Sequence, residues 1–173
     1  LEIKKVIYVD PELYGDLLTW LGGQPNFAPV ECHLPTGKKI IVAPGASIGL
    51  REWPYFPELC LAINSEFPEW EIVVVGTGED TRWSGRFRRL GVRFVDQVGK
   101  TSLGQLAELL GQGTVCIAND SGVAHLAGRA QSPTLVLFGP GDPNYVLPAG
   151  EKVVVIRNDS VACSPCESAH CRA

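Results

Sequence analysis

Short apolar runs recur along the chain, and each ends at a residue that interrupts regular structure. Six such runs are rich in Val and Ile and are closed by Gly, Asp, Asn or Pro; they lie at residues 38–45, 70–78, 92–97, 114–120, 133–140 and 152–159. Examples are "WEIVVVGTG" and "PTLVLFGP". Runs of this length and composition predict six β-strands.

Segments with the spacing of amphipathic helices separate most of these runs. They lie at about residues 55–67, 80–90, 102–111 and 121–131, and the third begins at Ser102 and ends at Gly111, as a capped helix does. Strands that are apolar throughout predict a parallel sheet with helices on both faces, because a solvated antiparallel sheet would alternate polar and apolar residues. The expected fold class is therefore a Rossmann-like α/β domain.

The first 37 residues do not follow this pattern. The segment "PELYGDLLTWLGG" predicts a short helix that stops at Gly22 and Gly23, and "QPNFAPVECHLPTG", with three prolines, predicts a linker. We therefore expect a linker over residues 1–37 and one folded domain over residues 38–173.

Composition narrows the classes of function. The chain has 173 residues, 45% of them hydrophobic, enough to bury one core. Its net charge of −4 provides no broad cationic surface for nucleic acid. No apolar run approaches the roughly 20 residues of a membrane span, and no secretory signal pattern opens the sequence, so we expect a cytoplasmic protein. Cys32, Cys60 and Cys116 are scattered and do not form a disulfide framework.

The ends of the predicted strands carry the candidate chemistry. Five of them combine Gly with Ser, Thr or Asp: "PGAS" (44–47), "GTGED" (76–80), "DQVGKTSL" (96–103), "NDSG" (119–122) and "FGPGDP" (138–143). Carboxyl ends of parallel strands meet at one edge of the sheet, where ligands bind. Glycine permits close approach, and the free amides of a helix N-terminus attract anions, so this edge suits a phosphorylated ligand. "GTGED" lacks the third glycine of a dinucleotide fingerprint, so it does not predict NAD.

These strand ends also carry a resemblance to a known family. The segments "IIVAPGASIGLREWP", "VVVGTGED", "VGKTSLGQLAELL", "CIANDSGVAHLAG" and "LVLFGPGDP", in this order and spacing, resemble the C-terminal half of glycosyltransferase family 9, the ADP-heptose:lipopolysaccharide heptosyltransferases. The resemblance implies a GT-B fold, in which two Rossmann-like domains face each other across a cleft. Residues 38–173 resemble the donor-binding domain, and residues 1–37 resemble the tail of the acceptor domain.

The resemblance implies an inverting transferase that needs no metal or other cofactor. Its donor would be ADP-heptose or a similar nucleotide sugar, and its acceptor a lipid-linked oligosaccharide of the lipopolysaccharide core, at the cytosolic face of the inner membrane. The catalytic base belongs to the first domain in this family, so none is expected here. Two alternatives remain open: a stand-alone nucleotide-binding module without transfer activity, and a transferase of the same fold that uses another nucleotide sugar.

The resemblance also assigns residues to the donor diphosphate: Gly45, Ala46, Ser47, Arg51, Ser121, Gly122, Val123 and His125. Arg51 stands where the family usually has Lys, and it replaces a point charge with a planar fork. Taken without the resemblance, Arg51 would be a solvated loop charge. The alternative for the second loop is that Asp120 or Ser121 only caps a helix and that His125 is a hydrogen-bonded interior residue.

The nucleoside is assigned to other loops, and the sugar to a residue of the "NDSG" loop. Glu79 matches a ribose ligand, although an acid there also stabilises a helix N-terminus. Lys100, Thr101 and Ser102 open a helix near the expected adenine, and Leu103 either packs on the base or belongs to the core. Because a carboxylate repels a diphosphate, Asp120 is assigned to hydroxyl groups of the donor sugar.

Two further clusters stand apart from this edge. "CSPCESAHC" brings Cys163, Cys166, His170 and Cys171 within nine residues, but the usual second ligand pair of a zinc site is missing, so no metal site is expected. The basic run consists of Arg82, Arg86, Arg88, Arg89 and Arg93, and we expect it to be a solvated helix face rather than a surface for an acidic partner.

Overall fold

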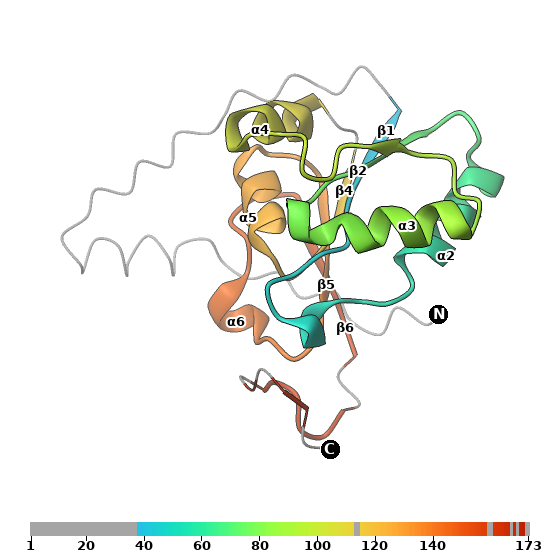
Figure 1. Ribbon diagram of the computed structural model, residues 1–173. Coiled ribbons are helices and arrows are strands. Elements are labelled where there is room, and N and C mark those ends of the chain that lie inside the picture. Colours follow the sequence, from blue (N-terminus) through green and yellow to red (C-terminus); the bar gives the residue numbers. More distant parts are fainter. Residues whose placement is uncertain (1–37, 113–114, 159–160, 167, 169, 172–173) are drawn as a thin grey trace.

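The computed structural model describes residues 38–112, 115–158, 161–166, 168 and 170–171 (Figure 1). The short helix and the linker that we expect within residues 1–37 lie outside these ranges. No helix within the ranges is long and apolar enough to cross a membrane.

Six strands in the described part of the chain form one parallel sheet in the order β3-β2-β1-β4-β5-β6. Their bounds are β1 (Lys39–Ala43), β2 (Glu71–Val74), β3 (Val95–Asp96), β4 (Val115–Asn119), β5 (Thr134–Phe138) and β6 (Val153–Arg157). The six predicted strands and their parallel arrangement are confirmed. All strand ends singled out in the sequence consequently lie at one edge of the sheet.

Helices connect the strands as the sequence predicts. The longer ones are α2 (Phe56–Glu66), α3 (Thr81–Arg89), α4 (Leu103–Gln112) and α5 (Gly122–Arg129). Three shorter elements were not predicted: η1 (Gly49–Arg51), η2 (Gly78–Asp80) and α6 (Pro143–Val146). The start of α4 is fixed by a reciprocal cap, in which the Gln105 amide donates to Ser102 Oγ (3.3 Å) and the Ser102 amide to Gln105 Oε1 (2.9 Å).

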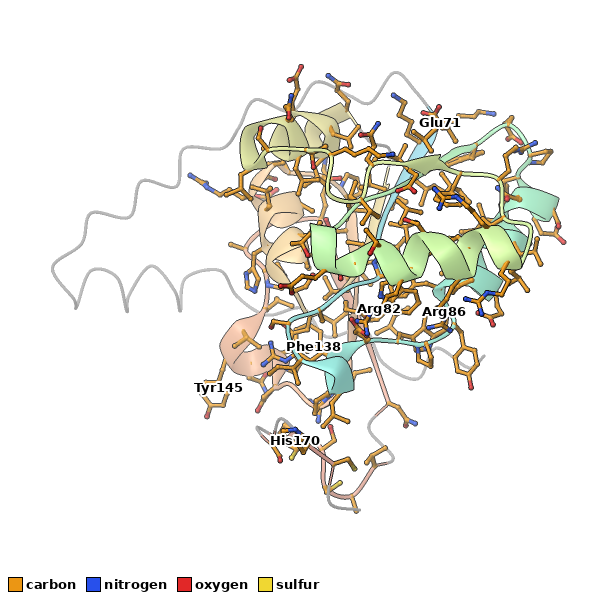
Figure 2. The ribbon with its side chains drawn as sticks, viewed as in Figure 1. Glu71, Arg82, Arg86, Phe138, Tyr145 and His170 are labelled. Carbon is orange, nitrogen blue, oxygen red and sulfur yellow. The ribbon has the colours of Figure 1, made fainter. Side chains whose placement is uncertain are left out.

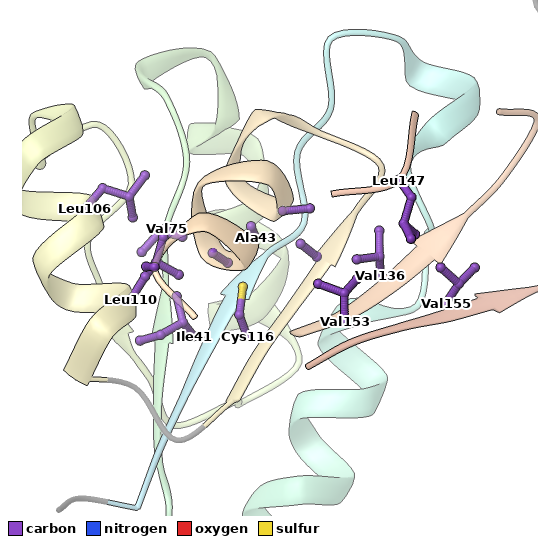
Figure 3. Packing of buried hydrophobic residues seen from close by; sticks show 14 of the residues in the cluster. Ile41, Ala43, Val75, Leu106, Leu110, Cys116, Val136, Leu147, Val153 and Val155 are labelled. Atoms are coloured by element: carbon purple, nitrogen blue, oxygen red, sulfur yellow. The ribbon is translucent and has the colours of Figure 1, made fainter. Parts of the chain in front are cut away.

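Successive side chains of β1 point to opposite faces of the sheet, and each face has its own hydrophobic core. Ile41 and Ala43 pack with α4 and α5, which contribute Leu110 and Ala124, among others (Figure 3). The intervening residue Val42 points to the opposite face, where α2 and α3 supply Phe56, Cys60, Trp83 and Phe87. Burial on both faces explains why the strand sequences show no polar alternation.

Strands β1 and β4 are neighbours in the sheet although two other strands separate them in the sequence. Ala43 at the end of β1 is opposite Ala118 near the end of β4. On one side of this pair the chain winds through β2 and β3, and on the other through β5 and β6, so the pair forms the topological switch point at which such sheets bind ligands. The "PGAS" and "NDSG" loops leave the sheet side by side at this point.

Candidate functional site

The loops after β1 and β4 are joined by the side chain of Asn119. Its Nδ2 donates to the carbonyl oxygen of Pro44 (2.8 Å), and its Oδ1 accepts from the amide of Trp53 (3.0 Å). Asn119 is fully buried. The sequence reasoning quoted this residue within "NDSG" but gave it no role; its signal is a polar residue closing an otherwise apolar central strand.

An ion pair spans the same two loops. Arg51 Nη1 lies 3.2 Å from Asp120 Oδ2, and the Asp120 side chain is only 2% exposed. Burial raises the pKa of Asp120 above its ordinary value, although Arg51 and His125 both act to lower it. The loop after β5 closes over the pair, since a Cβ added at Gly141 would lie 2.7 Å from Asp120 Oδ2. The interpretation of Arg51 as a solvated loop charge is therefore wrong.

The N-terminus of α5 opens beside this pair. Ser121 occupies the N-cap position but its side chain makes no capping hydrogen bond, and its buried Oγ has no hydrogen-bond partner among the described residues. Ser121 therefore does not cap the helix through its side chain. Gly122 is exposed, and a Cβ added there would meet nothing within 4 Å. The amides of Gly122 and Val123 belong to the first helical turn, which lacks intrahelical acceptors.

His125 lies one turn into α5 and is exposed, so the interpretation as an interior histidine is also wrong. Partial burial of its ring lowers the pKa of His125, while the Asp120 carboxylate raises it in part. The neutral imidazole, with one N–H donor, therefore predominates at neutral pH.

The "PGAS" loop uses one of its predicted ligand groups internally. The amide of Ala46 donates to Glu52 Oε1 (3.2 Å), and the same carboxylate oxygen pairs with Arg82, which is labelled in Figure 2. This amide was expected to hold a phosphate, and that role would require it to leave Glu52. Gly45 is half-buried and Ser47 is exposed at the edge.

The loop after β2 is built around Asp80, which the sequence reasoning missed. Asp80 Oδ2 accepts hydrogen bonds from the amide of Thr77 (2.7 Å) and from Thr77 Oγ1 (2.9 Å). A Cβ added at Gly45 would lie 2.0 Å from Asp80 Oδ1, and one at Gly76 would lie 2.7 Å from Oδ2, so a side chain at either position would require the Asp80 carboxylate to move. The Thr-x-x-Asp spacing of a capping box was the available signal. Glu79, the predicted ribose ligand, precedes Asp80 and is exposed.

The loop after β3 leaves its predicted ligand residues at the surface. Lys100 Nζ donates to the carbonyl oxygen of Asp96 (2.6 Å), Thr101 is half-buried and Ser102 caps α4. Leu103 is 78% exposed. Its interpretation as a core residue is therefore wrong, and it is free to contact a ligand.

The C-terminal cluster lies beside η1. Cys163, Cys166, His170 and Cys171 line an apolar cavity of about 730 Å³ together with Leu50 and Phe138, and Figure 2 labels His170 and Phe138 in this region. Within the part of the chain that the structure describes, no three His, Cys, Asp or Glu side chains are arranged to hold a metal ion. By contrast, the scattered Cys60 and Cys116 lie in the core, where burial raises their pKa to about 12.

The basic run is solvated as expected, since all its arginines except the half-buried Arg86 are exposed, but four of them also bind groups of the chain itself. Arg82 and Arg88 pair with carboxylates, Arg86 donates to the carbonyl oxygen of Pro54 and lies 4.5 Å from the centre of the Trp83 ring, and Arg93 donates to the carbonyl oxygen of Pro68. These contacts hold α3 and the segment after it against the rest of the domain.

Comparison with known proteins identifies relatives of this chain. The model of "Glycosyltransferase family 9 (heptosyltransferase)" matches residues 24–173. Lipooligosaccharide heptosyltransferase 2 of Haemophilus influenzae is 29% identical over 120 residues, which cover 66% of this chain and 35% of that protein. Lipopolysaccharide heptosyltransferase 2 of Escherichia coli K12 is 28% identical over 144 residues, covering 78% of this chain and 41% of that protein.

A solved structure shares the fold. The E. coli heptosyltransferase WaaC with ADP superposes with a TM-score of 0.66 at 19% identity, over 91% of this chain and 52% of that one. The expected Rossmann-like α/β fold is confirmed. The chain spans roughly a third to two fifths of the length of the relatives compared above.

Proposed function

This chain belongs to glycosyltransferase family 9, and we propose that residues 38–173 form the domain that binds the nucleotide-sugar donor of a heptosyltransferase-like enzyme. The observation that carries the proposal is the meeting of a cation and a helix N-terminus at the switch point: Arg51 pairs with Asp120 beside the open first turn of α5. This combination suits a diphosphate better than a neutral ligand.

The two phosphates would lie across the loops after β1 and β4. The amides of Gly122 and Val123 would donate to one phosphate, joined by the hydroxyl of Ser121, which has no hydrogen-bond partner among the described residues. Arg51 would turn part of its guanidinium to the other phosphate, near Gly45 and Ser47. The other candidates are Ala46, whose amide would first have to leave Glu52, and His125, whose neutral ring offers one donor.

These groups would do the chemical work of the domain. As the bond between the anomeric carbon and the diphosphate breaks, negative charge grows on the leaving oxygen, and fixed amides with a guanidinium stabilise it without a metal ion. The predicted contact of Asp120 with hydroxyl groups of the donor sugar would require the loop after β5 to move, because this carboxylate is 2% exposed and pairs with Arg51. In this proposal the catalytic base and the lipid-linked acceptor belong to a longer protein at the inner membrane, and inversion follows from attack opposite the leaving diphosphate.

The nucleoside would lie over the loops after β2 and β3. Glu79 is exposed there and suits the ribose hydroxyls, and Leu103, also exposed, offers an apolar face to adenine. Thr101 and Ser102 would border the base. The structure of E. coli heptosyltransferase WaaC holds ADP, which supports adenosine as the nucleoside.

Calorimetric titration of the 173-residue chain with ADP, UDP and GDP tests the proposal. We expect ADP to bind more tightly than UDP and GDP. Tighter binding of UDP or GDP would favour the transferase that uses another nucleotide sugar, and absence of binding by all three would contradict a donor site.

A product assay tests the proposal that the catalytic base lies outside this chain. We expect the purified chain to bind nucleotide and to form no transfer product with any acceptor, because the proposed base lies elsewhere. Detectable product would overturn that assignment of the base.

A further inference from the structure

Asn119 holds both ends of the loop that carries the proposed diphosphate ligands. Its two hydrogen bonds reach Pro44, the first residue of "PGAS", and Trp53, two residues after Arg51. The segment 44–53 between these contacts contains Gly45, Ser47 and Arg51. One buried side chain on β4 therefore fixes a ten-residue segment that leaves β1.

The chemistry of this contact requires an amide. Pro44 presents an acceptor and Trp53 presents a donor, and an asparagine side chain carries one donor and one acceptor in a fixed fork. An aspartate would lose the donor, and a leucine of similar size would lose both. Because Asn119 is fully buried, either loss would leave backbone groups without partners.

The contact matters for Arg51 because two anions would compete for its guanidinium. One is the buried carboxylate of Asp120, 3.2 Å away, and the other is the proposed phosphate. If only the ion pair held this loop, Arg51 could move inward toward the buried carboxylate of Asp120. A fixed backbone at Trp53 limits how far Arg51 can withdraw and keeps part of the guanidinium at the edge, where its side chain is 29% exposed.

We propose that Asn119 is a positioning residue for the donor diphosphate, holding segment 44–53 in register with the N-terminus of α5. This inference rests on the proposed function. It assigns to Asn119 no contact with the ligand; the residue acts through Arg51 and the amides of the loop.

The test compares ADP and AMP binding in the full chain carrying Asn119→Leu. We expect ADP affinity to fall at least about tenfold, roughly 1.4 kcal/mol, and AMP affinity to fall less, because AMP lacks the second phosphate proposed for Arg51. Titration calorimetry gives both constants, and urea unfolding shows that the variant is folded.

Thr134→Val is the matched control. Thr134 is also buried, on the neighbouring strand β5 but at the opposite edge of the sheet, where its Oγ1 donates to the carbonyl oxygen of Ser132 (2.7 Å). The Thr134→Val variant also loses a buried hydrogen bond from a side chain to a backbone carbonyl. Its stability should therefore fall, while its ratio of ADP to AMP affinity stays at the value of the unaltered chain.

The outcomes separate the two proposals. If the unaltered chain does not bind ADP, the proposed function fails. If it binds ADP and folded Asn119→Leu keeps the unaltered ratio of ADP to AMP affinity, the positioning role alone is overturned. If Asn119→Leu does not fold, hydrogen exchange on the unaltered chain decides: the amide of Trp53 should be more protected with ADP than with AMP at saturation, and equal protection overturns the inference.

Discussion

The candidate loops lie at one edge of the sheet, and the loops after β1 and β4 are held differently from the loops after β2 and β3. At the exits of β1 and β4, the residues around the proposed diphosphate site are tied into the interior through Asn119 and the Arg51–Asp120 pair. At the exits of β2 and β3, Glu79 and Leu103 are exposed, and local caps hold their loops. Charge is stabilised best by groups that are fixed in advance and partly removed from water, whereas a nucleoside can be held by surface side chains.

Removing the guanidinium of Arg51 should lower ADP affinity more than any other change at these loops. We expect Arg51→Ala to weaken ADP binding by roughly 1.5–3 kcal/mol, the range of charge-assisted hydrogen bonds, and AMP binding by less. The free energy of unfolding should also fall, because the buried carboxylate of Asp120 loses its cation. Titration with both nucleotides measures the effect, and Arg89→Ala, at an exposed arginine at the end of α3, is the control. Equal losses for ADP and AMP would place Arg51 outside the diphosphate site.

A side chain at Gly122, at the N-terminus of α5, should cause the next largest loss of ADP affinity. A Cβ at Gly122 meets nothing within 4 Å, so Gly122→Val should leave the melting temperature within a few degrees. The added side chain would stand where a phosphate must approach the amides, and ADP affinity should fall at least about tenfold, roughly 1.4 kcal/mol. His125→Ala should cost less, since the amides stay. A lower melting temperature with unchanged ADP affinity would show that the turn serves only the fold.

At the loops after β2 and β3 the expected effects are smaller. Glu79→Gln keeps the size of the side chain and removes its charge, so ADP affinity should fall by about 0.5–1.5 kcal/mol, the net value of a hydrogen bond. The preference for ADP over an analogue without ribose hydroxyls should shrink in the same variant. Competition titrations measure both, with Glu66→Gln at the exposed end of α2 as control. An unchanged preference would remove Glu79 from the ribose site.

We expect the titration of Asp120 to change stability the least, because Arg51 and His125 oppose the influence of burial on its pKa. Since the pKa of Asp120 is raised on folding, this group stabilises the fold most when it is protonated, below about pH 4, and that contribution is lost as the pH rises through the raised value. Asp120→Asn removes this dependence. Urea unfolding from pH 3 to neutral pH should therefore show the variant gaining stability relative to the unaltered chain as the pH rises. A difference that does not change with pH would contradict the raised pKa.

The sequence predicts the features that depend on the pattern of neighbouring residues. Six strands and four helices follow from apolar runs and their punctuation, and parallel pairing then places the candidate loops at one edge. The Arg51–Asp120 pair and the two contacts of Asn119 join residues 66 to 75 positions apart, and they depend on β1 and β4 being neighbours, which no local pattern states. The contact between the Ala46 amide and Glu52 was not expected for another reason: the two residues are six positions apart in one loop, and the sequence does not give the course of that loop.

The carboxylate of Asp80 also links three positions in the evolution of the chain. Gly45→Ala alone would bring a methyl group to 2.0 Å from Asp80 Oδ1, but the same change after loss of that carboxylate meets no such clash. Gly76 stands in the same relation to Asp80, with a 2.7 Å approach. Substitutions at the three positions are therefore epistatic, and each one's effect depends on the order in which they arise. In a combinatorial library, viable variants at positions 45 and 76 should be enriched among those in which residue 80 is small.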